Sequence, residues 1–204
     1  VDGISLHLTP SIGIAMYPTD GNDPDTLIKN ADAAMYLAKE KGRNNFQFYT
    51  PALNARTLDR LKLESDMRKG LALGHFELHY QPLIVGSDGS LRGAEALVRW
   101  RHPVRGLIPP LEFIPLAEET GLIIPLGEWV LETAAKQVTE WHKKGYAGLI
   151  VSVNISALQF KQSDFLERVE AILRSTATKP QSIELELTES LLMGDMESSI
   201  RLLQ

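Results

Sequence analysis

The chain of 204 residues contains no cysteine. This excludes a disulfide framework and any zinc or iron–sulfur site built on thiolates, and it suits a reducing compartment. A metal ion would have to be held by oxygen or imidazole ligands. The sequence also lacks an apolar run near the roughly 20 residues of a membrane helix, since the longest one surrounds residues 121–127. We therefore expect a cytoplasmic domain.

An excess of basic charge is absent as well. Lysine and arginine number 21 against 26 aspartates and glutamates, for a formal charge of −5. DNA and RNA are held largely by a positive field, so polymeric nucleic acid is excluded as a partner. The chain begins at Val1 without an initiator methionine and stops at Gln204 inside a helical pattern. We expect it to be part of a longer protein, in which sensor domains upstream or an inner-membrane anchor would lie outside this sequence.

The first 50 residues have a strand–helix–strand pattern. Residues 11–16 and 45–49 are typical of short strands, and between them apolar residues recur at helical spacing until Gly42, which is placed to end the helix. Such a piece buries too little surface for an independent domain. We interpret residues 1–50 as the tail of an α+β domain.

Residues 51–204 are interpreted as the first part of a second domain, opened by a charged connecting helix over residues 51–73. Helical regions separate most of the strands that follow, including a long one with an apolar stripe from Leu126 to Trp141. The four predicted strands cover residues 76–83, 91–100, 149–155 and 183–188. Alternation of strands and helices favours parallel strands joined by helical crossovers.

All four strands alternate apolar and polar residues, as Ile183-Glu184-Leu185-Glu186 illustrates. An exposed antiparallel sheet would alternate in the same way, but helices covering the apolar face would leave the polar face pointing inward. This is the layout of a (β/α)8 barrel, with its active site at the carboxyl ends of the strands. The predicted fold class is α/β, with an incomplete (β/α)8-type barrel of about four strands.

Glu95, Asn154 and Glu186 share the inward face on three successive strands. Two carboxylates and an amide oxygen suit Mg²⁺ or Mn²⁺, and a pair of such ions clamps the attacking and leaving oxygens of a phosphodiester. Arg99, on the same face as Glu95, can reach a phosphate. From the residues alone two alternatives stay open: Glu95 forms an ion pair with Arg99, and Asn154 ties down a loop.

A set of motifs gives this pattern a family resemblance. The run Glu95-Ala96-Leu97-Val98-Arg99-Trp100, followed by Arg101-His102-Pro103, resembles the signature of EAL-domain cyclic di-GMP phosphodiesterases. The other motifs occur in that family's order and spacing: Tyr80-Gln81-Pro82-Leu83, residues 110–118, Gly121-Leu122-Ile123, Val153-Asn154-Ile155-Ser156 and Glu186-Leu187-Thr188-Glu189.

The resemblance implies roles for particular residues. Glu95, Asn154 and Glu186 match the family's metal ligands, and Gln81 and Arg99 match positions that contact the dinucleotide. Glu189 matches the glutamate that organises a loop over the metal site. On the residues alone, Glu189 also fits a carboxylate that favours the start of a following helix.

Residues 1–50 resemble the C-terminal part of a GGDEF (diguanylate cyclase) domain through residues 11–15, 31–36 and 42–44. In that family the positions of Lys39 and Arg43 contact a nucleotide triphosphate, which implies GTP as a further partner. The alternative for both residues is a pair of cations that complement the C-terminal end of a helix.

The resemblance implies that the intact protein, a homodimer, hydrolyses cyclic di-GMP to a linear dinucleotide with two Mg²⁺ or Mn²⁺ ions. The paired aspartates and the lysine of the family's site belong after Gln204, so we expect this segment alone to be inactive. Two alternatives remain: a receptor that binds cyclic di-GMP without cleaving it, and a diguanylate cyclase with a regulatory EAL domain.

Overall fold

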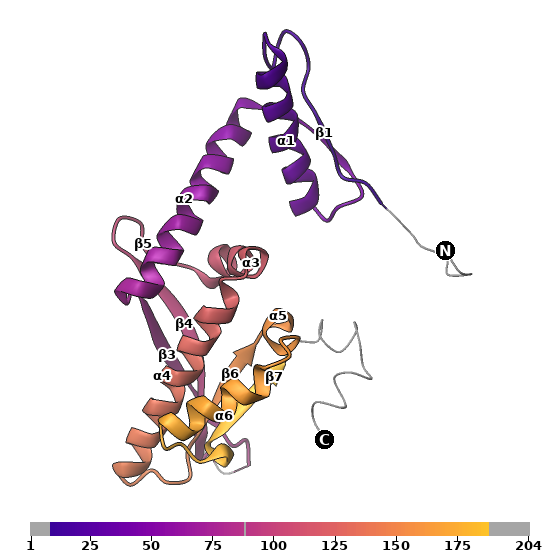
Figure 1. Cartoon of the computed structure of the whole chain (residues 1–204). Helices are drawn as coiled ribbons and strands as arrows, with labels where there is room; N and C mark the ends of the chain where they lie inside the picture. The colour runs from indigo at the N-terminus through magenta and orange to yellow at the C-terminus, as the bar shows by residue number, and fades with distance from the viewer. Residues whose placement is uncertain (1–8, 88, 188–204) are drawn as a thin grey trace, which may run out of the picture. The chain divides into compact units, whose positions relative to one another are not determined.

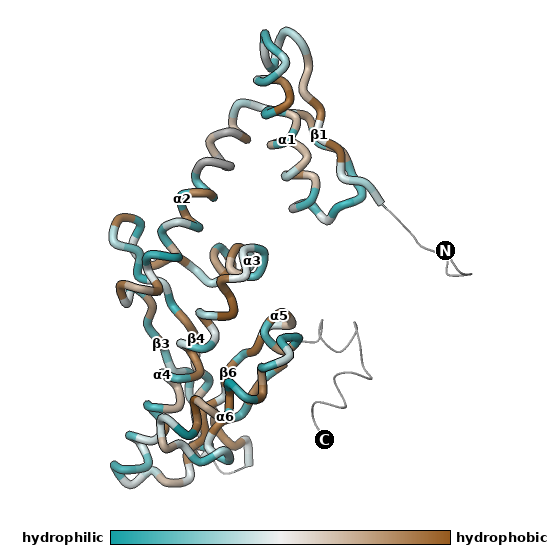
Figure 2. Tube along the Cα trace, viewed as in Figure 1, coloured by the Kyte–Doolittle hydropathy of each residue, from teal (hydrophilic) through white to brown (hydrophobic). Residues whose placement is uncertain are grey.

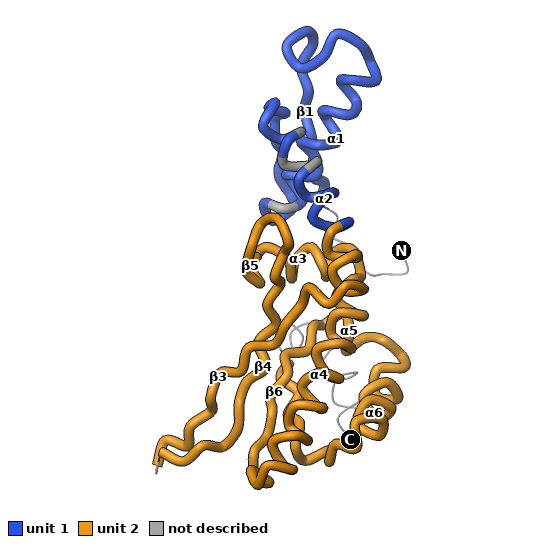
Figure 3. Tube along the Cα trace, turned by 90° about the vertical axis from the view of Figure 1, so that its left-hand side faces the viewer, with its two compact units in different colours: residues 1–65 blue, residues 66–204 orange. Residues whose placement is uncertain are grey.

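The computed structural model describes residues 9–87 and 89–187. It divides into two compact units, residues 1–65 and 66–204, which Figure 3 shows in separate colours. Helix α2 (Pro51–Leu73) runs across the boundary between them. Within the described residues, no helix is both long and apolar enough to cross a membrane.

The first unit is built on β1 (Ile12–Ile14), α1 (Pro24–Glu40) and β2 (Phe46–Phe48), as the sequence predicts. The two strands are parallel and α1 connects them. Helix α1 begins at Asp23, whose carboxylate accepts a hydrogen bond from the backbone N–H of Thr26 at 2.8 Å. This bond satisfies one of the N–H groups that the first turn of a helix leaves without a partner.

Gly13 sets how β1 packs on α1. A Cβ atom at this position would lie 1.9 Å from the carbonyl oxygen of Ala31, so only glycine permits the close approach. Neighbouring residues of a strand point to opposite faces, and Ile12 and Ile14 therefore face away from α1. The exposure of Ile12 and of its strand partner Phe46 agrees with this orientation.

The second unit contains an open five-stranded sheet. Its strands are β3 (Phe76–Ile84), β4 (Leu91–His102), β5 (Gly106–Ile108), β6 (Ile150–Ile155) and β7 (Ile183–Leu187). Their order is β3-β4-β6-β7, and β5 pairs with β4 beyond the stretch that β6 covers. The predicted α/β class is confirmed, and the described strands do not close into a barrel.

One expectation about the sheet is wrong. Strands β4, β6 and β7 are parallel, but β3 runs antiparallel to β4. The physical reason is the connection: only residues 85–90 separate the two strands, which suffices for a hairpin, whereas a parallel crossover needs a dozen residues or more.

Helices cover one face of this sheet. They are α3 (Pro110–Thr120), α4 (Ile123–Lys143), α5 (Ala157–Phe160) and α6 (Phe165–Ser175), with a short 3-10 helix η1 (Pro180–Ser182) before β7 (Figure 1). The predicted long helical region is two helices, because Gly121 adopts a left-handed conformation with φ of 72° and ends α3.

The hydrophobic core lies between the sheet and these helices. Figure 2 shows hydrophobic residues along β4 and β6. Trp100 of β4 is fully buried; its ring stacks on Phe76 at 5.4 Å, and Phe113 of α3 packs against it at 5.8 Å. The opposite face carries exposed polar groups, Gln81 and Asn154 among them.

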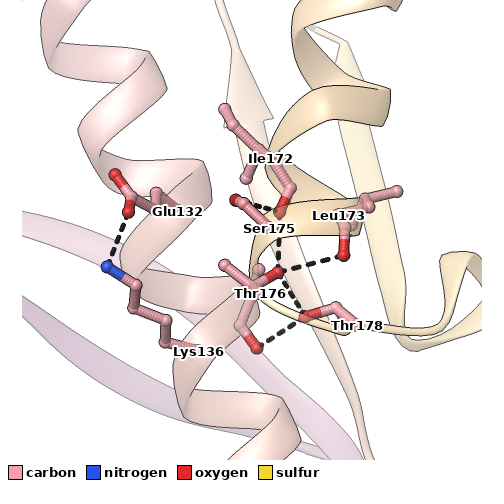
Figure 4. A network of polar contacts seen from close by, with 8 residues as sticks. Glu132, Lys136, Ile172, Leu173, Ser175, Thr176 and Thr178 are labelled. Atoms are coloured by element: carbon pink, nitrogen blue, oxygen red, sulfur yellow. Dashed lines mark hydrogen bonds and ion pairs between the residues drawn. The ribbon is translucent and has the colours of Figure 1, made fainter.

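A cluster of threonine hydroxyls fastens the segment before β7 to α4. The buried Thr178 donates from Oγ1 to the carbonyl oxygen of Ala135 at 3.0 Å, so it must accept from Thr139 at 2.9 Å. Thr176 lies 2.7 Å from Thr178 and also reaches the carbonyl oxygen of Ile172 (Figure 4). These bonds hold Thr178, just before η1 and β7, against α4.

Candidate active site

The predicted site residues meet on one face of the sheet. Gln81 of β3 is the register partner of Glu95 on β4, and Asn154 of β6 is the partner of Glu186 on β7. Side chains at paired positions project to the same side of a sheet. The structure therefore places these four residues on the same face of the sheet, opposite the helices, with Gln81 and Glu186 on the outer strands β3 and β7.

Glu95 and Asn154 are in direct contact. The Nδ2 atom of Asn154 donates to Oε1 of Glu95 at 2.7 Å. Two oxygens bound at right angles to one cation, each about 2.1 Å from it, are separated by about 3 Å, which is close to this distance. The amide of an asparagine can be turned to present its oxygen in place of its nitrogen. The pair therefore fits a hard divalent cation.

Glu186, the third predicted metal ligand, lies on the strand next to Asn154. It is half-buried on β7, next to Asn154. In the portion of the chain that the structure describes, no group of three or more histidine, aspartate or glutamate side chains could hold a metal ion. Glu189, the predicted catalytic residue, lies outside the described residues.

A β-bulge on β4 gives Glu184 of β7 an arginine partner. Leu83 pairs with Gly93 and Ile84 with Leu91, so Arg92 is the extra residue on β4. Its guanidinium contacts Glu184 at 3.0 Å, although strict alternation would turn it to the helix-covered face. The fully buried Ser152 donates to the same carboxylate at 3.3 Å. The carboxylate of Glu184 thus has partners within the protein, Arg92 and Ser152.

Arg99 borders a cavity of about 250 Å³ at the carboxyl ends of β4 and β6. The wall of this cavity includes Asn154 and, from α3, Ile114 and Glu118. The half-buried Arg99 donates from Nη1 to the carbonyl oxygen of Val98 at 2.9 Å. Arg99 is thus a cation at the border of a mainly apolar cavity, whose wall also includes Ile123, Leu126 and Val130 of α4.

Next to Arg99 is a charged cluster that sequence reasoning missed. Arg101 donates to both carboxylate oxygens of Glu77, from Nη2 at 2.7 Å and from Nε at 3.1 Å, and Nε2 of His79 lies 2.9 Å from the same carboxylate. The hydrogen bonds from Arg101 and then from His79 lower the pKa of Glu77 from 4.5 to about 2. The opposed charges on neighbouring strands are the sequence signal that points to this pair.

His102 has a structural role. It is buried, its Nδ1 accepts from the backbone N–H groups of Val104 and Arg105, and its Nε2 lies 3.2 Å from Asp66. Since Nδ1 is an acceptor, Nε2 carries the proton and donates to the aspartate. The ring holds the tight turn between β4 and β5 against α2.

The turn after Asn154 is fixed by Gln159. Ser156 and Gln159 form a reciprocal capping box at the start of α5. The buried amide of Gln159 also fills the space beside Gly127 of α4, where a Cβ atom would lie 1.8 Å from its Nε2. Asn154 is therefore held between the sheet and a turn anchored to α4.

In the first unit, Lys39 and Arg43 are both exposed near the end of α1. The turn after the helix takes three successive positive φ angles, 96° at Gly42, 58° at Arg43 and 50° at Asn44. The N–H of Arg43 donates to the carbonyl oxygen of Ala38, which keeps this turn close to the helix end. Two exposed cations thus flank the C-terminal end of α1.

Comparison with known proteins agrees with these observations. Residues 64–204 match the family described as "EAL domain", and residues 1–45 match "Diguanylate cyclase, GGDEF domain". The chain is 43% identical over 199 residues to the bifunctional diguanylate cyclase/cyclic di-GMP phosphodiesterase MucR of Pseudomonas aeruginosa, covering 98% of this chain and 29% of that protein. It is also 43% identical to the cyclic di-GMP phosphodiesterase PdeR of Escherichia coli, covering 98% of this chain and 30% of that protein.

Solved structures give the same result. The phosphodiesterase part of MucR in complex with c-di-GMP has a TM-score of 0.68 and 42% identity, over 70% of this chain and 57% of that one. The EAL enzyme Bd1971 in its cGMP-bound form has a TM-score of 0.65 and 27% identity, over 87% and 51%. The chain spans less than a third of the length of MucR or PdeR. It belongs to the EAL domain family, and its EAL part is preceded by the C-terminal part of a GGDEF domain.

Proposed function

We propose that the protein containing this chain hydrolyses cyclic di-GMP to a linear dinucleotide. The observation that supports this most is the 2.7 Å contact between Glu95 and Asn154, close to the cavity beside Arg99. The relatives named as cyclic di-GMP phosphodiesterases support the choice of substrate.

Under this proposal Glu95, Asn154 and Glu186 hold Mg²⁺ or Mn²⁺, with two ions in the intact site. Bound there, the ions supply Lewis-acid stabilisation and a water of lowered pKa. The protein's own part is to fix the oxygen ligands: paired register places Asn154 beside Glu186, and the hydrogen bond keeps Asn154 next to Glu95, where turning the amide would present its oxygen. Glu189 has the proposed catalytic role of organising a loop over the metal site.

Arg99 and Gln81 bind the dinucleotide in this proposal. The guanidinium of Arg99 offers a phosphate several N–H donors in place of the single carbonyl of Val98. Gln81, exposed on β3 directly opposite Glu95, has an amide that can donate and accept toward the same ligand.

The domain division belongs to the same proposal, with residues 1–50 in the GGDEF part and residues 51–204 in the EAL part. The two family matches end at residue 45 and begin at residue 64, on either side of this boundary. Lys39 and Arg43 then contact the triphosphate of GTP. The name of MucR, which includes a diguanylate cyclase, supports this second nucleotide.

The deciding experiment is Glu95→Ala in the full-length protein. Hydrolysis of cyclic di-GMP in Mg²⁺ is expected to vanish, with an unchanged circular dichroism spectrum, because a ligand and not a core group is removed. Glu132→Ala is the matched control, since Glu132 is a half-exposed glutamate of α4 paired with Lys136. Unchanged turnover in Glu95→Ala would contradict the metal assignment, and binding without turnover by the wild type would favour a receptor.

A further inference from the structure

Glu77 and Arg99 are directly opposite each other in the antiparallel pair β3–β4. Opposed residues of such a pair have Cβ atoms only about 5 Å apart, and opposite charges there attract. An ion pair between these two side chains would occupy the guanidinium of Arg99. A negatively charged ligand would then have to displace a carboxylate that is fixed to the same sheet.

The structure shows a different pairing for Glu77. Arg101, two residues further along β4, donates to both carboxylate oxygens at 2.7 and 3.1 Å. His79 approaches the same carboxylate from β3 at 2.9 Å. The hydrogen bonds from Arg101 and then from His79 lower the pKa of Glu77 to about 2, so both contacts stabilise its charged form.

Arg99 has a neutral hydrogen-bond partner at the border of the cavity. It donates to the carbonyl oxygen of Val98, which is a neutral acceptor, and it borders the cavity together with Asn154. Replacing a neutral acceptor by a phosphate oxygen increases the strength of the hydrogen bond, because the acceptor then carries charge. Exchange of the Val98 carbonyl for a phosphate oxygen would therefore strengthen the hydrogen bonding of Arg99.

We infer that Arg101 is a positioning residue for the dinucleotide site: by holding both oxygens of Glu77, it keeps this carboxylate away from Arg99 and leaves Arg99 available to a phosphate of the ligand. The inference rests on the proposed function, because it takes the ligand to be cyclic di-GMP. It goes beyond that function by assigning a role to two residues, Glu77 and Arg101, that do not themselves touch the ligand.

Two other readings make different predictions. A solvent-exposed ion pair usually contributes little, and in that case Arg101 is dispensable for the ligand. Alternatively, Arg101 leaves Glu77 and contacts the ligand itself. A double replacement separates these readings, since removing Glu77 as well as Arg101 cancels a positioning effect but not the loss of a direct contact.

The test measures cyclic di-GMP binding to the full-length protein by calorimetry in EDTA, so that metal affinity does not enter. Arg101→Ala is expected to weaken binding about tenfold, which is the effect of roughly one unfavourable charge contact. Glu77→Gln alone is expected to bind like the wild type, and Glu77→Gln combined with Arg101→Ala is expected to recover wild-type affinity. Arg174→Ala, which removes an exposed arginine paired with Glu170 on α6, is the matched control.

Each outcome supports or contradicts the positioning role of Arg101. Unchanged affinity in Arg101→Ala overturns the inference, as does a double variant as weak as the single one. If the wild type neither binds cyclic di-GMP in EDTA nor hydrolyses it in Mg²⁺, the proposed function fails and the inference with it. If it hydrolyses the ligand but binds it only with the metal, the same variants are compared by KM in Mg²⁺. The side chain of Arg101 is 66% exposed, so the variants are expected to fold, which the midpoint of thermal unfolding checks. Arg101→Gln replaces Arg101→Ala if the alanine variant unfolds.

Discussion

Asn154 donates a 2.7 Å hydrogen bond to Glu95, a residue 59 positions earlier in the chain. The two residues lie on the adjacent parallel strands β4 and β6, so this bond joins the strands on their polar face. Asn154 can be replaced by a second carboxylate or by alanine, and the two variants test whether the pair binds a cation.

Replacement of Asn154 is expected to change how strongly Mg²⁺ stabilises the protein. Asn154→Asp places a second carboxylate beside Glu95, which strains the metal-free protein and attracts the cation, so the Mg²⁺-induced rise in the midpoint of thermal unfolding should exceed that of the wild type. Asn154→Ala removes the ligand and should reduce the rise. Equal rises in all three proteins would show that no cation binds at this position.

Arg99→Ala is expected to weaken cyclic di-GMP binding by about 1.5–3 kcal/mol, the range for hydrogen bonds to charged groups. The Mg²⁺ concentration that gives half-maximal turnover should change much less, because Arg99 contacts the ligand and not the metal in the proposed site. Calorimetry in EDTA measures the first quantity and an Mg²⁺ titration of hydrolysis measures the second. Comparable losses in both would indicate that Arg99 acts on the structure of the sheet.

Thr178→Val is expected to lower the free energy of unfolding by about 0.5–1.5 kcal/mol, because it removes the hydroxyl that donates a second hydrogen bond to the carbonyl of Ala135, which already accepts one within α4. Urea denaturation followed by circular dichroism gives the value. Thr178→Ser keeps the hydroxyl and serves as the control, with a smaller loss. A valine variant as stable as the wild type would mean that the hydroxyl cluster does not fasten the segment before β7.

Glu77 should contribute to stability in a defined pH range. Its pKa in the folded protein is about 2, below the ordinary value of 4.5, so its contribution is present above pH 4.5 and is lost as the pH falls from there toward 2. Glu77→Gln should therefore show a smaller decrease in the midpoint of thermal unfolding between pH 5 and pH 2 than the wild type. Parallel curves for the two proteins would contradict the Glu77–Arg101 interaction.

The faces of the strands were predictable because alternation with a period of two is a local property. It places Glu95 and Arg99 on one face of β4, and the structure agrees. The same argument fails at Arg92, since one inserted residue reverses the alternation on its N-terminal side. The direction of β3 was mispredicted because strand pattern carries no direction, whereas the length of residues 85–90 does.

Short elements and contacts between residues far apart in the chain could not be predicted from the sequence pattern. Strand β5 and helix α5 span three and four residues, too few for a periodic pattern to repeat twice. The contact of Thr178 with Ala135 joins residues 43 positions apart, and a threonine in a loop gives no sign of it. The roles of Gln81, Glu95, Arg99, Asn154 and Glu186 in binding stay predictions, and the experiments above address those of Glu95, Arg99 and Asn154.

The antiparallel direction of β3 has a consequence for the order in which the site forms. Gln81 and Glu95 meet across a hairpin, so their pairing closes only a short loop and can form early, as soon as both strands have been synthesised. The bond from Asn154 to Glu95 closes a much longer loop that includes α3 and α4. The hairpin that carries Gln81 and Glu95 is therefore expected to fold first. The bond between Glu95 and Asn154 is expected to form only when β6 has docked on β4.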